Sequence, residues 1–193
     1  MIILNELKDA LQILKLNRAK MADVAGRKQA TVFGIIFLLV LPVVNILLSV
    51  FNYPSGFGSI FSRYLLWPAF IPSLSFVATT FLISLIAERV FHGGKDHVGF
   101  FRIMAYASVV LWVTVVPFLL GVLGIIDAQS LFKLIYLLSG ALVLYVAFNA
   151  LMEHHKLTKE HAVLVIIAAI FIFMISSSIL GKLLVGSGYR MLY

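Results

Sequence analysis

Residues 100–124 read FFRIMAYASVVLWVTVVPFLLGVLG, and after Arg102 this stretch carries no charged side chain. As an α-helix rising about 1.5 Å per residue, a run of this length crosses the roughly 30 Å of hydrocarbon in a bilayer. It is the middle one of five such stretches. We therefore expect an all-α fold, an integral membrane bundle of five transmembrane helices near residues 31–51, 64–87, 103–124, 131–152 and 162–181.

The composition supports a membrane protein with almost no extramembrane mass. Of 193 residues, 62% are hydrophobic and 12% are charged, against about 25% charged in a soluble domain. The short polar connections predict one membrane domain over residues 30–182. A cytosolic amphipathic and basic segment, residues 1–29, precedes it, and a short non-cytosolic tail, residues 183–193, follows. Cysteine is absent from the sequence, which excludes disulfides and thiol chemistry.

The first residues predict an amphipathic helix. One face of this helix is apolar and the opposite face is polar: Ile3, Leu4, Leu7, Ala10, Leu11 and Leu14 against Asn5, Lys8, Asp9 and Gln12. Two interpretations remain open. The helix lies on the membrane surface as an interfacial helix, with the basic residues after it near anionic headgroups, or it docks on the protein's own cytosolic loops.

The distribution of lysine and arginine predicts the orientation. Eleven lie in the N-terminal segment and the second and fourth connections, against four on the opposite side. This excess places the N-terminus in the cytosol and the C-terminus outside. The formal charge of +7 is dispersed at the ends of apolar runs, so we expect membrane lipids as partners and no nucleic acid.

The cores of the five expected spans contain no Asp, Glu, Lys, Arg or His, which argues against an ion-coupled transporter. Small and weakly polar residues recur instead at helical spacing. This pattern predicts faces where helices pack closely, and the alternative is the lining of a lipid or solute groove. The residues are Ser73, Thr80 and Ser84 in the second span and Ala162, Ala169 and Ser176 in or near the fifth. Pro42 and Pro117 predict kinks, and Thr114 is placed to satisfy part of the backbone that Pro117 interrupts.

All five histidines lie in two connections expected on the cytosolic side. Together with a carboxylate they form a candidate site for zinc or another divalent ion: His92, Asp96, His97, His154, His155 and His161. Their spacing matches no known metal signature, and the alternative is a pair of solvated or lipid-facing loops. Apart from this divalent metal, the sequence indicates no cofactor.

No sequence motif of a hydrolase, metalloprotease, nucleotide-binding loop or dinucleotide site is present. We therefore expect no catalytic residue and no enzyme activity. The remaining enzymatic alternative is a lipid-modifying transferase that uses Glu88, Asp96 and the histidines as acid or base.

The order of features resembles the Yip1-domain membrane proteins, in particular the short five-span bacterial and archaeal members. The resemblance rests on LKLNRAKMADVAGRKQATVFGIIFLLV, FRIMAYASVV, LIYLLSGALVLYVAFNALMEHHKLTKEHAVLVI and the closing SGYRMLY. The chain departs from the family pattern at Val109 and Val110, where proline is common, and at His161, where lysine is common.

The resemblance implies a non-enzymatic protein of a prokaryotic plasma (inner) membrane. Eukaryotic relatives are linked to vesicle trafficking and small-GTPase partners. We expect a membrane-organising, trafficking-type or partner-binding role, with a second copy of the chain or another membrane protein as partner. The alternative is a small carrier or channel for lipid or divalent metal, with the histidine-rich loops as its cytosolic mouth.

Overall fold

The computed structural model describes residues 2–52, 66–122 and 128–186, and every regular element in these ranges is helical. The predicted boundaries at Tyr64 and Gly124, and residues 187–193 of the predicted tail, lie outside the described residues. The elements are α1 (Ile2–Leu14), α2 (Arg18–Gly26), α3 (Gln29–Asn52), α4 (Trp67–Arg89), α5 (His97–Ala107), the 3₁₀ segment η2 (Ser108–Thr114), α6 (Val115–Val122), α7 (Ala128–Glu153) and α8 (Lys159–Leu184).

Five helical stretches in the described chain are long and apolar enough to cross a membrane, which confirms the expected fold class. They are Gln29–Leu48, Trp67–Arg89, His97–Pro117, Ser130–Glu153 and Lys159–Leu184. The third span combines α5, η2 and the start of α6. It begins at His97, whereas the sequence placed its start near residue 103, after the charge of Arg102.

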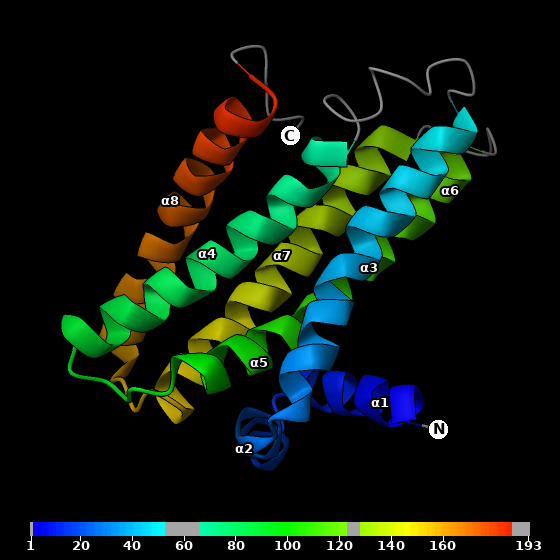
Figure 1. Cartoon of the computed structure of the whole chain (residues 1–193). Helices are drawn as coiled ribbons and strands as arrows, with labels where there is room; N and C mark the ends of the chain where they lie inside the picture. The colour runs from blue at the N-terminus through cyan, green and yellow to red at the C-terminus, as the bar shows by residue number, and fades with distance from the viewer. Residues whose placement is uncertain (1, 53–65, 123–127, 187–193) are drawn as a thin grey trace.

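The elements divide into a bundle of spans and a cap of two short helices (Figure 1). α1 and α2 lie across one end of the bundle, beside the start of α3. The connections 90–96 and 154–158 lie at the same end, and the C-terminal end of α8 lies at the other. We call α1, α2 and these two connections, with the helix ends that adjoin them, the N-terminal face.

The third span is the centre of the bundle. In its most apolar window 56% of the residues are buried, against 17–33% in the other four spans. Phe100, Ile103 and Tyr106 are completely buried, and α5 touches α1, α2, α3, α4 and α7. Each of the other spans therefore has one side that faces the surroundings and one side that packs on this helix or on its neighbours.

The small residues of the second and fifth spans form helix-packing faces, as predicted. Thr80 and Ser84 of α4 and Ala162 and Ala169 of α8 are buried, and α4 makes its most extensive contact with α8. The hydroxyl of Ser73 instead joins α4 to α3 by donating to the carbonyl of Leu38 at 3.0 Å. Close approach of small side chains is the usual way in which membrane helices associate.

The third span changes its hydrogen-bond pattern in the middle. The seven residues of η2 adopt 3₁₀ geometry directly before the helix that contains Pro117. The hydroxyl of Thr114 donates to the carbonyl of Leu111 at 2.6 Å, which is not the carbonyl of Val113 that Pro117 leaves without its helical donor. The sequence did not indicate the 3₁₀ segment.

A close backbone approach joins α3 to α5. A Cβ atom added at Gly34 would lie 2.8 Å from the Cβ of Ala105, so Gly34→Ala should overpack this contact. We expect a lower thermal midpoint in detergent, because overpacking costs about 1–3 kcal/mol and the better helix preference of alanine returns at most about 1 kcal/mol. The double variant Gly34→Ala/Ala105→Gly should recover most of the loss; a double variant no more stable than Gly34→Ala would disprove this contact.

Candidate functional site at the N-terminal face

α1 docks on the protein through one narrow face. Glu6, Ala10 and Ile13 are buried in it, and the helix touches α2, α5 and α7. Of the two interpretations left open by the sequence, docking on the protein is therefore observed. The predicted apolar face is divided: Ala10, Leu7 and Leu14 pack on the core, whereas Ile3, Leu4 and Leu11 remain exposed.

Glu6 connects α1 to the central helix. Its Oε2 accepts a hydrogen bond from the hydroxyl of Tyr106 at 2.5 Å, and its Oε1 lies 3.4 Å from Nη1 of Arg27. Glu6 shows 6% exposure and Tyr106 shows none. A buried carboxylate is costly unless it is paired and hydrogen-bonded, so the pairing with both Arg27 and Tyr106 is what allows Glu6 to occupy this position.

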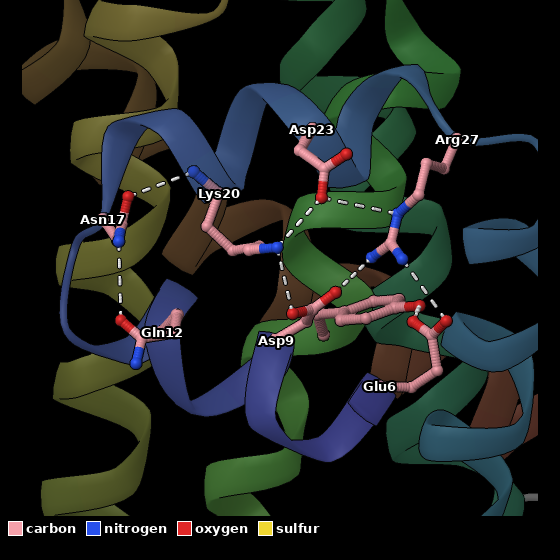
Figure 2. Close-up of polar contacts among 8 residues, drawn as sticks. Glu6, Asp9, Gln12, Asn17, Lys20, Asp23 and Arg27 are labelled. Atoms are coloured by element: carbon pink, nitrogen blue, oxygen red, sulfur yellow. Dashed lines mark hydrogen bonds and ion pairs between the residues drawn. The ribbon is translucent and has the colours of Figure 1, made fainter. Parts of the chain in front are cut away.

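Three further charges extend this arrangement along α1 and α2, as Figure 2 shows. Asp9 contacts Nη2 of Arg27 at 2.5 Å and Nζ of Lys20 at 3.1 Å. Asp23 contacts Lys20 at 3.1 Å and Nε of Arg27 at 3.7 Å. The hydrogen bonds that Lys20 donates to Asp23 and Asp9 raise its pKa. Burial opposes the charge of Arg27, but its bond to Asp9 and the nearby Glu6 and Asp23 raise its pKa overall.

Arg102 brings a positive charge to the start of the third span, and hydrogen bonds to α2 and α3 stabilise the charge there. Its Nη1 donates to the carbonyl of Ala25 in the last turn of α2, and its Nε donates to the hydroxyl of Thr31 in α3 at 2.8 Å. A cation at a helix C-terminus is favourable because the last carbonyls there lack partners. The third span can therefore start before Arg102 instead of after it.

Asp96 directly precedes α5 as its N-cap, and it contacts the connection that follows α7. Its Oδ1 accepts from the backbone N–H of Gly99 at 2.8 Å, which is a helix N-cap. Nε2 of His154 lies 3.1 Å from the carbonyl oxygen of Asp96 and 3.3 Å from its Oδ2. A Cβ at Gly99 would lie 2.1 Å from that Oδ2, so a larger residue here would displace the Asp96 side chain.

Ser84 lies at the centre of a chain of polar contacts between α4, α5 and the connection 154–158. Its Oγ is 2.8 Å from Nδ1 of His97 and 2.9 Å from Nε2 of His155. The far nitrogen of His97 is 2.9 Å from Oε2 of Glu88. The far nitrogen of His155 is 2.6 Å from the carbonyl oxygen of Gly94. The chain therefore runs from Gly94 to Glu88 through two imidazoles and one hydroxyl.

The hydrogen bond to Gly94 fixes the roles of both nitrogens of His155. Burial lowers the pKa of His155, although its bond to Gly94 partly opposes this effect. A neutral imidazole carries one hydrogen, which it donates to the carbonyl oxygen of Gly94, so Nε2 of His155 accepts from the hydroxyl of Ser84.

The connection 90–96 lies against the backbone of the connection 154–158. The N–H of Gly94 donates to the carbonyl of His155 at 2.9 Å, and the N–H of Gly93 donates to the carbonyl of Ala87 at 2.8 Å. A Cβ at Gly93 would lie 2.9 Å from the carbonyl oxygens of both Ala87 and His155. Only glycine permits this approach without displacement of a backbone.

The structure brings together four of the six candidate metal residues: Asp96, His97, His154 and His155. His92 lies in a left-handed turn with φ of 55°, and the ring of His161 packs on Phe91 with centroids 4.6 Å apart. Within the described residues, no three His, Asp or Glu side chains form a group that could hold a metal ion. The divalent-metal site stays a prediction.

Glu88, His97 and Ser84 have the order of groups that activates a serine nucleophile. Ser84 and His155 are completely buried, however, and the hydroxyl of Ser84 already contacts two imidazoles. The arrangement joins α4 to α5 and to the connection 154–158, and its hydroxyl is covered by the protein.

Sequence reasoning missed Glu6, Arg27 and Tyr106. The signal for Glu6 was its position four and seven residues before Ala10 and Ile13, which puts a carboxylate on the same helix face as two apolar residues. No comparable signal pointed to Tyr106, which is separated from Glu6 by 100 positions in the chain.

Five apolar spans around a central helix, with a docked amphipathic helix at one end, define a small α-helical integral membrane protein. The sequence profile of the Yip1 domain matches residues 12–180. The chain therefore belongs to the Yip1-domain family, as its resemblance implied. No curated protein and no solved structure matches it.

The lowered pKa of His155 predicts a loss of stability in acid. In the unfolded chain this imidazole takes up a proton near its ordinary pKa of about 6.5, whereas the folded protein keeps it neutral. Its contribution is therefore complete above about pH 6.5 and decreases as the pH falls. We expect the thermal midpoint in detergent to fall less between pH 7 and pH 5 in His155→Gln than in the wild type. An equal fall of the thermal midpoint in His155→Gln and in the wild type would contradict the prediction.

The Glu6–Tyr106 bond should control the docking of α1. Tyr106→Phe removes the donor, and hydrogen bonds to charged groups contribute about 1.5–3 kcal/mol, equivalent to roughly 10-fold to 100-fold in the population of the released helix. Tryptic cleavage after Lys8 or Lys15 should accelerate accordingly, measured by mass spectrometry of the detergent-solubilised protein. Tyr145→Phe, at an exposed position of α7, is the control, and equal cleavage rates in the two variants would disprove the role of Tyr106.

Proposed function

We propose that this Yip1-family protein is a non-enzymatic membrane-organising protein that holds α1 in the cytosolic surface of the bilayer. The observation that carries the proposal is an exposed apolar row on a helix that is itself fixed to the membrane domain. The N-terminal face is cytosolic in this proposal, and the host membrane is a prokaryotic plasma membrane.

α1 has three distinct faces. The first docks on the protein through Glu6, Ala10 and Ile13, as described above. The second is an apolar row in which Ile3 is 65%, Leu4 is 63% and Leu11 is 53% exposed. The third is polar and includes Asn5 and Lys8. An apolar row of this extent is stabilised by burial in an apolar medium, and the nearest large apolar medium is the bilayer around the spans.

The charges near α1 agree with this placement. Lys15, Arg18 and Lys28 are exposed, and each basic side chain near an anionic bilayer surface contributes about 1 kcal/mol of attraction. The eleven lysines and arginines counted for the cytosolic side belong to the N-terminal face and the helix ends beside it. The positive-inside tendency thus supports a cytosolic position for α1.

The docked state gives this helix a property that a free amphipathic helix lacks. Its depth and direction are set by Glu6, Arg27 and Tyr106, so the apolar row enters one leaflet at a fixed place beside the bundle. Such one-sided insertion spreads the headgroups of that leaflet and favours curved or loosely packed membrane. The proposal requires no reaction, which agrees with the enclosed position of Ser84.

A pair of single-cysteine variants tests the proposal, since the natural sequence has no cysteine. Leu11→Cys and Lys8→Cys are labelled with an environment-sensitive fluorophore and reconstituted in vesicles that contain anionic lipid. We expect a blue-shifted emission and quenching by brominated lipid at position 11, and aqueous emission at position 8. Aqueous emission at both positions would overturn the proposal. Blue-shifted emission at position 11 without quenching by brominated lipid would also overturn it, since the apolar row would then contact another protein or a second copy of the chain.

A further inference from the structure

A partly open cavity of about 280 Å³ lies within the bundle, and all five spans contribute to its wall. It lies where α4 and α7 face each other with little direct contact, because both pack mainly on other helices. Ser73, Thr80 and Ala169, which the sequence assigned either to packing faces or to a lipid groove, all line it. The same small residues thus serve both purposes, since they let helices approach and leave space beside the contact.

The cavity lies at the middle of the membrane. Its lining comes from 37–41 in α3, 72–83 in α4, 104–112 in α5 and η2, 136–147 in α7 and 169–174 in α8. Each of these sets is central in the corresponding span. At this depth the bilayer consists of hydrocarbon tails, and headgroups and water are far away.

The wall offers carbon rather than polar atoms to an occupant. Ser73 and Ser108 donate to the carbonyls of Leu38 and Ala105 at 3.0 and 2.7 Å. Thr80 donates to its own helix at 2.8 Å, and Nε1 of Trp112 donates to the carbonyl of Phe37 at 3.1 Å. The hydroxyl of Thr79 has no hydrogen-bond partner among the described residues, but surrounding atoms cover it. A polar solute would therefore find few partners here.

Gly140 of α7 provides part of the space. It lines the cavity, and a Cβ added at this position would meet no atom within 4 Å. A larger side chain at this position can therefore occupy the cavity without an immediate clash, which makes the position suitable for a blocking substitution.

We propose that this cavity binds one acyl chain of a phospholipid from the surrounding bilayer. An unfilled apolar cavity forfeits contacts on every wall, and a hydrocarbon chain is the only abundant molecule at this depth. The headgroup of the bound lipid stays outside the bundle, since the depth and the carbon lining exclude it. The site does not depend on α1 and is independent of the function proposed above.

Tryptophan fluorescence can report on the occupant. The chain has two tryptophans, so Trp67→Phe leaves Trp112, in the cavity wall, as the single reporter. This protein is reconstituted in vesicles of phospholipids that carry bromine in the middle of the acyl chain. Gly140→Leu is added to block the site, Gly140→Ala serves as the matched small substitution, and Gly140→Val replaces the leucine variant if that variant does not fold.

We expect strong quenching of Trp112 in the Trp67→Phe protein, with or without Gly140→Ala. Quenching should fall when Gly140→Leu is added, because the blocking side chain displaces the brominated chain. Equal quenching in all variants would mean contact with outer lipids only and would overturn the proposal. As a second measurement, native mass spectrometry should detect one retained phospholipid per chain after delipidation, lost in Gly140→Leu. Retention of detergent in place of lipid, or of lipid in both proteins alike, would also overturn it.

Discussion

The polar groups at the start of the third span must all be satisfied before this helix can stand at the centre of a membrane bundle. Asp96 contacts His154, and His97 reaches the connection 154–158 through Ser84. Arg102 bonds to the end of α2 and the start of α3, and Tyr106 bonds to α1. A buried polar group left without a partner costs about 1–3 kcal/mol, and more if it is charged. One stretch of three helical turns therefore determines where five other segments lie.

The spans were predictable because hydropathy is a local property. A helix that faces lipid must be apolar over its whole length. Residues 31–51 and 131–152 can therefore be recognised as spans without knowledge of the helices that they contact. The packing faces of α4 and α8 were predictable for the same reason, since the spacing of Thr80, Ser84 and Ala169 is enough. Those parts of the fold rest on periodicity within one helix.

The candidate site was predictable only in part. The sequence pointed to the two histidine-rich connections and to their meeting on one face, but it did not identify Ser84 as the group between His97 and His155. Glu6 and Tyr106 are separated by 100 positions, and Ser84 and His155 by 71. Such pairs depend on the relative rotation of helices, which hydropathy does not determine. The exposed apolar row of α1 was visible in the sequence. The sequence did not show that Glu6, on the neighbouring face of the helix, takes part in docking.

The 3₁₀ segment in the third span also affects how far that span reaches. Seven residues in η2 extend about 14 Å at about 2.0 Å per residue, against about 10.5 Å for the same residues in α-helix. The central helix is therefore longer than its residue count indicates. A return of η2 to α-helical bonding would shorten this one span while its four neighbours keep their length. The hydrophobic thickness that the protein matches is thus tied to the hydrogen-bond pattern of seven residues at its centre.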